Sequence, residues 1–524
     1  MPKKIQWLFT ILFIVAISPL IYLSLNTPFA LIDDYTDWMI IREGFKFIFF
    51  NHVVSLFELS MDRVRPMFEL KNYFTWNIFG DQPWAHHLFR WAIKTGAFVL
   101  IFFSTKNILV KCVNKYPEKN YLSIIFFLPL FIWFLFPNNP DARLAPVELE
   151  LSLFLALLIF SAIKIILSLS SSEKNNWALF FLYVGVIGVV ASKETGFAYA
   201  FIALVPIFFC AIFLKKNLAL LYLKLAPILS FTLWSGFSTW FKLINDVTPY
   251  GNSGFAAVKA NARGLYQVTL LTGINPVIQV ILMAPIAYLL YYCATYFIAN
   301  RKEFFISDQK IQYLAIFLLI VGELLGSVLM ALLSPLICIR YIFPLLVPYT
   351  IIIGLTGAAF FSIQEVGKKA RVLVAIASCW VLFCSYSATV SQYGIQYSER
   401  NAEKLFLADA LLITRENQGK ISIHSAVGEF KDKAVKYLTW YRQRFYADFS
   451  VTAIPGLENF DGVNAYRTLS DVPQNPGVLI SHNSYMESDI TLLANKFSKI
   501  FGASGNIRFD CGSSNESDWK IFKK

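Results

Sequence analysis

The sequence predicts a polytopic α-helical membrane protein with about eleven transmembrane helices and a small mixed α/β domain at its C-terminal end. Of its 524 residues, 56% are hydrophobic and only 15% are charged, whereas a soluble domain carries about 25% charged residues. Apolar stretches long enough to cross about 30 Å of hydrocarbon recur along the chain. The basic residues between these stretches lie in every second loop, that is, in the loops on one side of the membrane, as the positive-inside rule predicts. These three observations exclude a soluble enzyme.

The first apolar run extends from Ile5 to Leu25, directly after Lys3 and Lys4. It is longer than the apolar core of a signal peptide and lacks a clear cleavage site, so we interpret it as a retained transmembrane helix. The further spans are predicted at residues 85–105, 121–136, 147–168, 177–192, 196–214, 218–241, 276–299, 311–333, 340–361 and 370–391.

Basic clusters define one face of the membrane. When Lys3 and Lys4 are placed in the cytoplasm, every later cluster falls on the same side. These clusters are Lys106, Lys111, Lys115 and Lys119; Lys174; Lys215 and Lys216; Arg301, Lys302 and Lys310; and Lys368, Lys369 and Arg371. The formal net charge of +12 is therefore a topology signal, and no nucleic-acid partner is predicted. The outer segments are 26–84, 137–146, 192–195, 242–275, 334–340 and everything after about 394.

The composition changes after residue 394, which divides the chain into a transmembrane domain at 1–394 and a soluble domain at 395–524. The tail contains turn signals such as Ile454-Pro-Gly and a short strand-like run that begins at Val478. These features predict an extracytoplasmic domain. The seven Cys show no CxxC motif or Cys/His metal spacing, so neither a disulfide framework nor a structural metal is expected.

The first outer segment, 26–84, opens with Asp33 and Asp34 and continues to Asp37. A carboxylate beside apolar surroundings is suited to act as a general base, but an acid here also suits a helix N-terminus. The same region holds two further candidate site residues. They are Arg65, which precedes a proline, and His87, at the start of the second span. Arg65 suits a phosphate ligand or an interfacial side chain.

Later outer segments add further candidates. Asp141 lies in the second, the adjacent pair Lys193 and Glu194 in the third, and Arg340 with Tyr341 opens the tenth span. Lys193 and Glu194 have an alternative as an interfacial ion pair. An outer Arg340 runs against the positive-inside bias, which favours an anionic ligand. Glu323 lies within a span and is expected to need a partner inside the bundle.

The order of these motifs resembles the GT-C superfamily of integral-membrane glycosyltransferases, in particular the protein O-mannosyltransferase and aminoarabinose-transferase group. The resemblance covers most of residues 1–394. It implies an inverting transferase with its site on the outer face and a polyprenyl-phosphate sugar as donor. By motif, Asp33 or Asp34 matches the first-loop acid and Asp141 the second, while Lys193, Glu194 and Arg340 match residues at the donor phosphate.

We therefore expect transfer of a sugar to a hydroxyl of a lipid-linked glycan, a lipid or a protein, in a bacterial inner membrane. Asp33 is favoured over Asp34 as the base, because Asp34 followed by Asp37 better suits a helix cap. No cofactor is required and a divalent metal is not implied. The alternatives are a lipid-linked-oligosaccharide flippase or transporter, an O-antigen polymerase or ligase, and a membrane-tethered receptor or scaffold.

Overall fold

The structure is a computed structural model. It describes residues 3–28, 65–80, 82–112, 127, 129–135, 147–170, 175–193, 195–216, 218–244, 307–333, 343–362, 380, 382–398 and 400–401, together with strand segments between 421 and 523.

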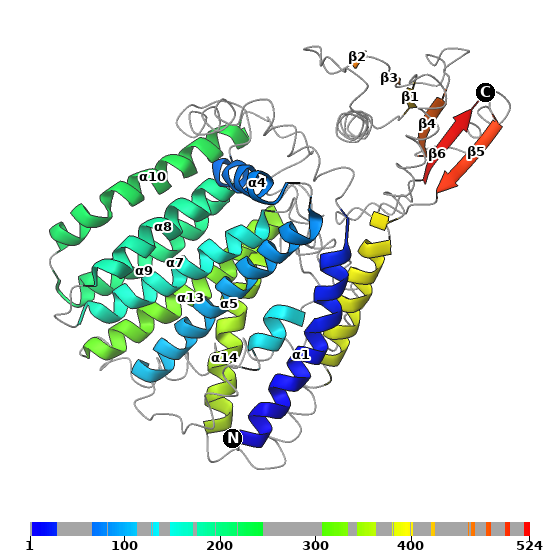
Figure 1. The fold of residues 1–524 in the computed structure, drawn as a ribbon. Helices are drawn as coiled ribbons and strands as arrows, with labels where there is room; N and C mark the ends of the chain where they lie inside the picture. Colours follow the sequence, from blue (N-terminus) through cyan, green and yellow to red (C-terminus); the bar gives the residue numbers. More distant parts are fainter. Residues whose placement is uncertain are drawn as a thin grey trace.

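Long helices build the membrane domain (Figure 1). They are α1 (Lys3–Asn26), α4 (Pro66–Phe79), α5 (Pro83–Cys112), α7 (Glu148–Ser168), α8 (Asn176–Ser192), α9 (Gly196–Phe213), α10 (Leu218–Ile244), α13 (Asp308–Leu333) and α14 (Leu346–Ser362). Residues 129–135 and 382–398 are also helical. The predicted spans are thus helical at nearly all of their described positions. The span at 276–299 lies entirely outside the described residues, and those at 121–136, 340–361 and 370–391 are described in part.

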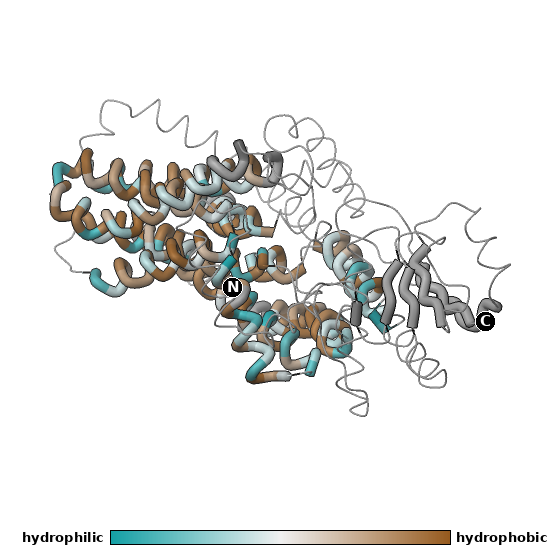
Figure 2. Tube along the Cα trace, turned by 90° about the horizontal axis from the view of Figure 1, so that it is seen from above, coloured by the Kyte–Doolittle hydropathy of each residue, from teal (hydrophilic) through white to brown (hydrophobic). Residues whose placement is uncertain are grey.

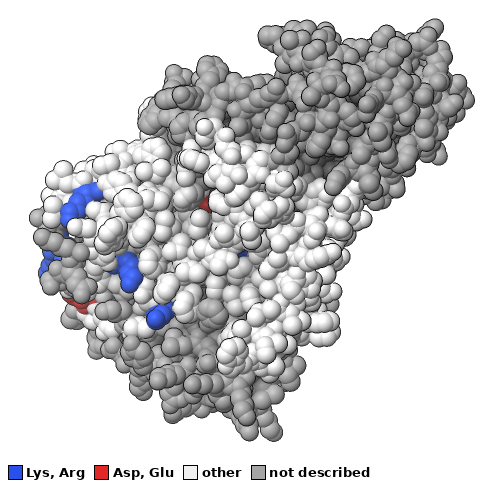
Figure 3. Space-filling view, viewed as in Figure 1, with Lys and Arg blue, Asp and Glu red and all other residues white. Residues whose placement is uncertain are grey.

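The helix surfaces are those of a multi-pass membrane protein. Among the described helices, α1, α5, α7, α9, α10 and α13 are long and apolar enough to cross a membrane by length and composition, while α8 and residues 343–358 are shorter apolar helices. Apolar residues dominate the described helices in Figure 2. In Figure 3 the described face of the bundle carries few charged side chains, and most of its Lys and Arg lie toward the left of the view.

Glycines allow the central helices to approach closely. Helix α7 runs antiparallel to α8, and a Cβ added at Gly185 would lie 3.0 Å from the backbone of Leu158. Helix α9 packs on α13 in the same way, since a Cβ at Gly326 would lie 2.4 Å from Cδ1 of Ile202. Small residues at such crossings are typical of membrane helices, whose packing depends on close van der Waals contact.

Helix α4 is an element that the sequence analysis missed, because it lies within the segment 26–84 that was assigned as a loop. Pro66 occupies its first turn, where a missing backbone N–H costs nothing. Gly80 ends the helix with a φ of 54°, which favours glycine, and its N–H donates to the carbonyl oxygen of Trp76 at 2.9 Å. Helix α5 then begins at Pro83, so α4 is joined to the bundle by a short connection.

The tail contributes a six-stranded sheet with the order β2-β3-β1-β4-β6-β5. Its strands are β1 (Ile421–His424), β2 (Asn459–Phe460), β3 (Val463–Tyr466), β4 (Val478–Asn483), β5 (Ser498–Ala503) and β6 (Asp518–Lys523). Strand β1 is parallel to β3 and β4, and the other pairs are antiparallel. In Figure 1 the strands lie beyond the end of the bundle that carries α4. The assignment of residues 395–524 as one α/β domain stays a prediction.

Candidate active site

The register between α7 and α8 brings two charged residues together at one end of the bundle. Gly188 of α8 lies against Phe154 of α7. Because the two helices are antiparallel, this pairing continues toward the end of α8, where Lys193 lies beside Glu148, the first residue of α7. Nζ of Lys193 donates to Oε1 of Glu148 at 2.9 Å. Both side chains are largely buried, so this is an ion pair inside the protein.

Both helix dipoles favour this ion pair. Glu148 lies in the first turn of α7, where backbone N–H groups give a partial positive charge. Lys193 follows the last turn of α8, where carbonyl groups give a partial negative charge. Each charge is therefore stabilised by its own helix and by its partner, which offsets part of the cost of removing both from water.

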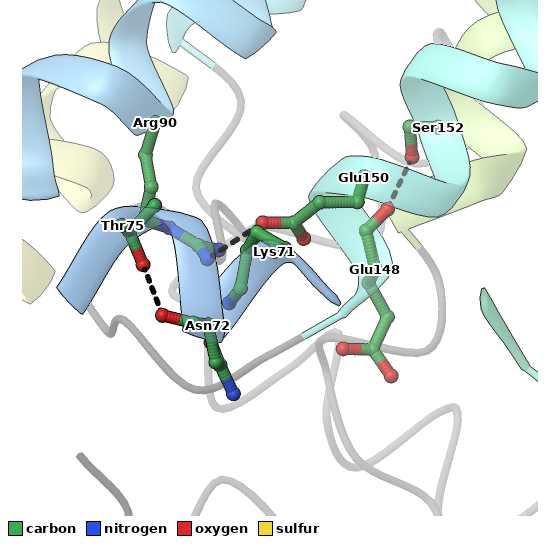
Figure 4. A network of polar contacts seen from close by, with 7 residues as sticks. All are labelled: Lys71, Asn72, Thr75, Arg90, Glu148, Glu150 and Ser152. Atoms are coloured by element: carbon green, nitrogen blue, oxygen red, sulfur yellow. Dashed lines mark hydrogen bonds and ion pairs between the residues drawn. The ribbon is translucent and has the colours of Figure 1, made fainter. Parts of the chain in front are cut away.

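A second acid of α7 binds two cations from other helices (Figure 4). Oε1 of Glu150 lies 3.4 Å from Nη1 of Arg90 on α5 and 3.7 Å from Nζ of Lys71 on α4. Glu148 and Glu150 are two residues apart, so they point to different sides of α7 and bind different partners. The polar network thus connects α4, α5, α7 and α8 at the same end of the bundle.

Helix α5 carries a buried polar stripe that runs inward from this end. His86, Arg90 and Lys94 follow one another at intervals of four residues and share one face of the helix. Nε2 of His86 lies 2.9 Å from the carbonyl oxygen of Gly80. Deeper in the bundle, Nζ of Lys94 lies 3.4 Å from the carbonyl oxygen of Phe134 and 5.0 Å from the ring of Trp91.

The turn between α8 and α9 fixes the position of Lys193. The N–H of Gly196 donates to the carbonyl oxygen of Lys193 at 2.8 Å. A Cβ added at Gly196 would lie 1.8 Å from the carbonyl oxygen of Val189. Only glycine fits this approach, so the turn is tight and Lys193 is held where it reaches Glu148.

Glu323 on α13 differs from the acids of α7. Its side chain is fully buried, and neither carboxylate oxygen has a hydrogen-bond partner among the described residues. The partner that the sequence analysis expected is thus not found in that part of the chain. Its polar neighbours are Ser327, one turn further along α13, and Tyr199 of α9, which is hydrogen-bonded to Ser327.

The described helices have the architecture of a known membrane enzyme. The crystal structure of ArnT from Cupriavidus metallidurans in the apo state is similar, with a TM-score of 0.51 and 11% sequence identity over 99% of this chain and 98% of that chain. The chain shares its fold with ArnT. A second crystal structure of that protein, bound to undecaprenyl phosphate, gives a TM-score of 0.49 and 10% identity. The sequence matches no protein-family model and no curated protein.

ArnT is a GT-C aminoarabinose transferase, so the resemblance predicted from the motif order is confirmed at the level of the fold. The likeness extends over nearly the whole of both chains, including the residues after 394. Because one fold hosts several activities, the function of this chain has to be argued from its own side chains.

Three of the predicted site residues are described, and they lie at the same end of the ArnT-like bundle. Lys193 forms an ion pair with Glu148. The sequence analysis had considered an ion pair between Lys193 and the adjacent Glu194 as the alternative to a catalytic role. Arg65 is the N-cap residue of α4, and His87 is buried in the first turns of α5. The remaining candidates lie outside the described residues: Asp33, Asp34, Asp141, Glu194, Arg340 and Tyr341.

The sequence analysis missed the charged residues inside the predicted spans. Glu148 and Glu150 were treated as the start of an apolar span, and Arg90 as part of another. An ionisable residue within a membrane span is costly unless it is paired, and this signal would have identified them. Within the described residues, no group of three or more His, Cys, Asp and Glu side chains is arranged to hold a metal ion. Metal independence stays a prediction.

Proposed function

We propose that this protein is an inverting glycosyltransferase of the bacterial inner membrane. It moves a sugar from a polyprenyl-phosphate donor to a hydroxyl of a lipid-linked glycan, a lipid or a protein on the outer face. The ArnT-like fold supports this class of reaction. The observation that carries the proposal is the buried ion pair of Lys193 and Glu148, at the end of the bundle where the basic clusters predict the outer face.

The reaction needs a base and a cationic group. The acceptor oxygen loses its proton as it forms a bond to the anomeric carbon, and the bond from that carbon to the phosphate oxygen breaks on the opposite face. We assign the base to Asp33 or Asp34 and the orientation of the acceptor to Asp141. A single displacement of this kind inverts the anomeric centre and needs no covalent intermediate.

The leaving phosphate needs positive charge as its bond to the sugar breaks. We assign this role to Lys193 and Arg340, with Glu194 and Tyr341 beside them, and Arg65 at the start of α4 as a further phosphate ligand. Glu148 holds the ammonium group of Lys193 in place at 2.9 Å. These cations supply the charge that a divalent metal supplies in other transferases, so a metal is not required.

The same topology places the N-terminus in the cytoplasm and the domain at 395–524 outside. An odd number of spans produces this arrangement. The tail then lies on the side of the proposed site.

The test is transfer by the purified chain in lipid nanodiscs. With a radiolabelled undecaprenyl-phosphate sugar and a lipid-linked glycan acceptor, we expect labelled acceptor of inverted configuration and free undecaprenyl phosphate. Lys193→Gln should lower turnover by about 10² to 10³-fold, the effect of removing one group that stabilises transition-state charge. The matched control is Lys216→Gln, at an exposed lysine of the opposite end of α9.

Two outcomes contradict the proposal. Equal turnover in wild type and Lys193→Gln removes the assignment of Lys193. Transport of the intact sugar lipid across the membrane, without transfer to any acceptor, favours the flippase instead.

A further inference from the structure

Tyr199 is a buried polar residue of α9 that the proposed mechanism does not use. Only 2% of its surface is exposed, although it lies in the first turn of the helix, three residues after Gly196. The hydroxyl of a buried tyrosine usually has a hydrogen-bond partner, because leaving it unpaired in an apolar interior is costly. The partner of Tyr199 therefore indicates what this residue does.

The packing of α9 on α13 determines which residue Tyr199 meets. The two helices lie side by side (Figure 1). A Cβ added at Gly322 would lie 2.9 Å from Cγ2 of Ile202, and one at Gly326 would lie 2.4 Å from Cδ1 of the same residue. Tyr199 precedes Ile202 by three residues and shares its face of α9. It meets Ser327, the residue after Gly326, and forms a hydrogen bond with it.

The direction of this hydrogen bond follows from the other contact of Ser327. Oγ of Ser327 donates to the carbonyl oxygen of Glu323, one turn earlier on α13, at 2.8 Å. A serine hydroxyl has a single proton, so this oxygen accepts from Tyr199, and Tyr199 is the donor. Ser327 is itself 2% exposed, so water competes little for its oxygen. The hydrogen bonds of Tyr199 and Ser327 thus join the first turn of α9 to the backbone of α13.

The same turn of α9 adjoins the ion pair of the proposed site. The N–H of Gly196, the first residue of α9, donates to the carbonyl oxygen of Lys193 at 2.8 Å. The negative charge of Glu148, the partner of Lys193, also acts on the side chain of Tyr199. We infer that Tyr199 is a positioning residue for Lys193, an inference that rests on the proposed function. Its hydrogen bond holds the start of α9 on α13 and thereby fixes the ammonium group for the leaving phosphate.

The experiment measures sugar transfer in nanodiscs by variants that each remove one hydroxyl group. Tyr199→Phe keeps the ring. It should lower kcat about tenfold, because displacing a charge that stabilises the transition state is costly, while the KM for the sugar lipid changes less than about twofold. Ser327→Ala should reproduce this effect. Tyr222→Phe, at an exposed tyrosine of α10, is the matched control and should keep both constants.

Two double variants identify the route of the effect. Tyr199→Phe combined with Ser327→Ala should lower kcat no further than either change alone, because both break the same hydrogen bond. Tyr199→Phe added to Lys193→Gln should also have no further effect, because the charge that Tyr199 positions is already gone. Size exclusion and thermal unfolding measure the amount of folded protein for each variant.

The possible results separate this inference from the proposed function. Wild-type transfer with unchanged kcat in Tyr199→Phe and Ser327→Ala overturns the positioning role alone. A fall in kcat that matches the loss of folded protein makes the hydrogen bond structural and overturns the role as well. A further tenfold fall in the background of Lys193→Gln shows that Tyr199 does not act through Lys193. Wild type without transfer overturns the proposed function, and the positioning role with it.

Discussion

Within the described residues, buried glutamates lie in two regions of the bundle, and their carboxylates have different surroundings in the two. At the end where α4, α5, α7 and α8 meet, Glu148 and Glu150 each contact at least one cation. On α13, Glu323 is fully buried and neither of its oxygens is hydrogen-bonded within the described part of the chain. All three acids lie in apolar helices, so burial alone does not distinguish them.

This difference in surroundings indicates which of the three glutamates are ionised in the folded protein. A carboxylate is ionised in a low-dielectric interior only when charges or hydrogen-bond donors compensate its lost hydration. Glu148 and Glu150 have such compensation, and we interpret them as charged. Glu323 has none among the described residues, and we interpret it as neutral. Among the described residues, the buried carboxylates that are paired with cations therefore lie together at one end of the bundle.

The largest effect is expected from breaking the ion pair of Lys193 and Glu148. Lys193→Met leaves Glu148 buried without its cation, which should lower the free energy of unfolding by about 3 to 5 kcal/mol. Thermal unfolding in detergent measures this loss. The double variant Lys193→Met with Glu148→Leu should recover most of the stability while turnover stays low. If Lys193→Met alone unfolds at the wild-type temperature, the pair does not stabilise the bundle.

An intermediate effect is expected from the turn that positions Lys193. Gly196→Ala forces a Cβ against the carbonyl oxygen of Val189. The resulting shift of the turn should destabilise the protein by about 1 to 3 kcal/mol, in the range of overpacked sites, and lower turnover. Gly394→Ala is the control, because a Cβ at that helical position meets no atom within 4 Å. Equal unfolding temperatures in the two variants would show that the turn tolerates a side chain.

The smallest effect is expected at Glu323, and its sign is opposite. Glu323→Leu removes a buried carboxyl that makes no hydrogen bond within the described residues. It should leave stability unchanged or raise it by about 1 kcal/mol, because an unsatisfied polar group is lost. Glu148→Leu, measured beside it by thermal unfolding, should destabilise. A large loss of stability in Glu323→Leu would place a partner for Glu323 outside the described residues.

The helices of the membrane domain were predictable because hydropathy is a local property of the sequence. An apolar run such as Glu148–Ser168 carries its own signal, independent of what it packs against. Helix α4 was missed because the prediction relied on long apolar runs. It has 14 residues, too few to cross a bilayer, and its polar residues resemble those of a loop.

The site was less predictable because its contacts depend on the register between helices. The sequence singled out Lys193, but its partner Glu148 lies 45 residues away and follows from the antiparallel packing of α7 and α8. Glu150 contacts Lys71 and Arg90 on two further helices, and no spacing in the sequence encodes this. Asp33, Asp34, Asp141 and Arg340 stay predictions, since they lie outside the described residues.

The burial of the Glu150 network also determines how the protein responds to ionic strength. Mobile ions screen exposed charges over a Debye length of about 8 Å at physiological salt, but they reach buried pairs much less. Arg90 and Glu150 are both buried, and Lys71 is nearly so. The attachment of α4 to α7 is therefore nearly independent of salt concentration. A membrane protein whose polar end faces a compartment of variable salt content keeps the same arrangement of charges in dilute and in concentrated media.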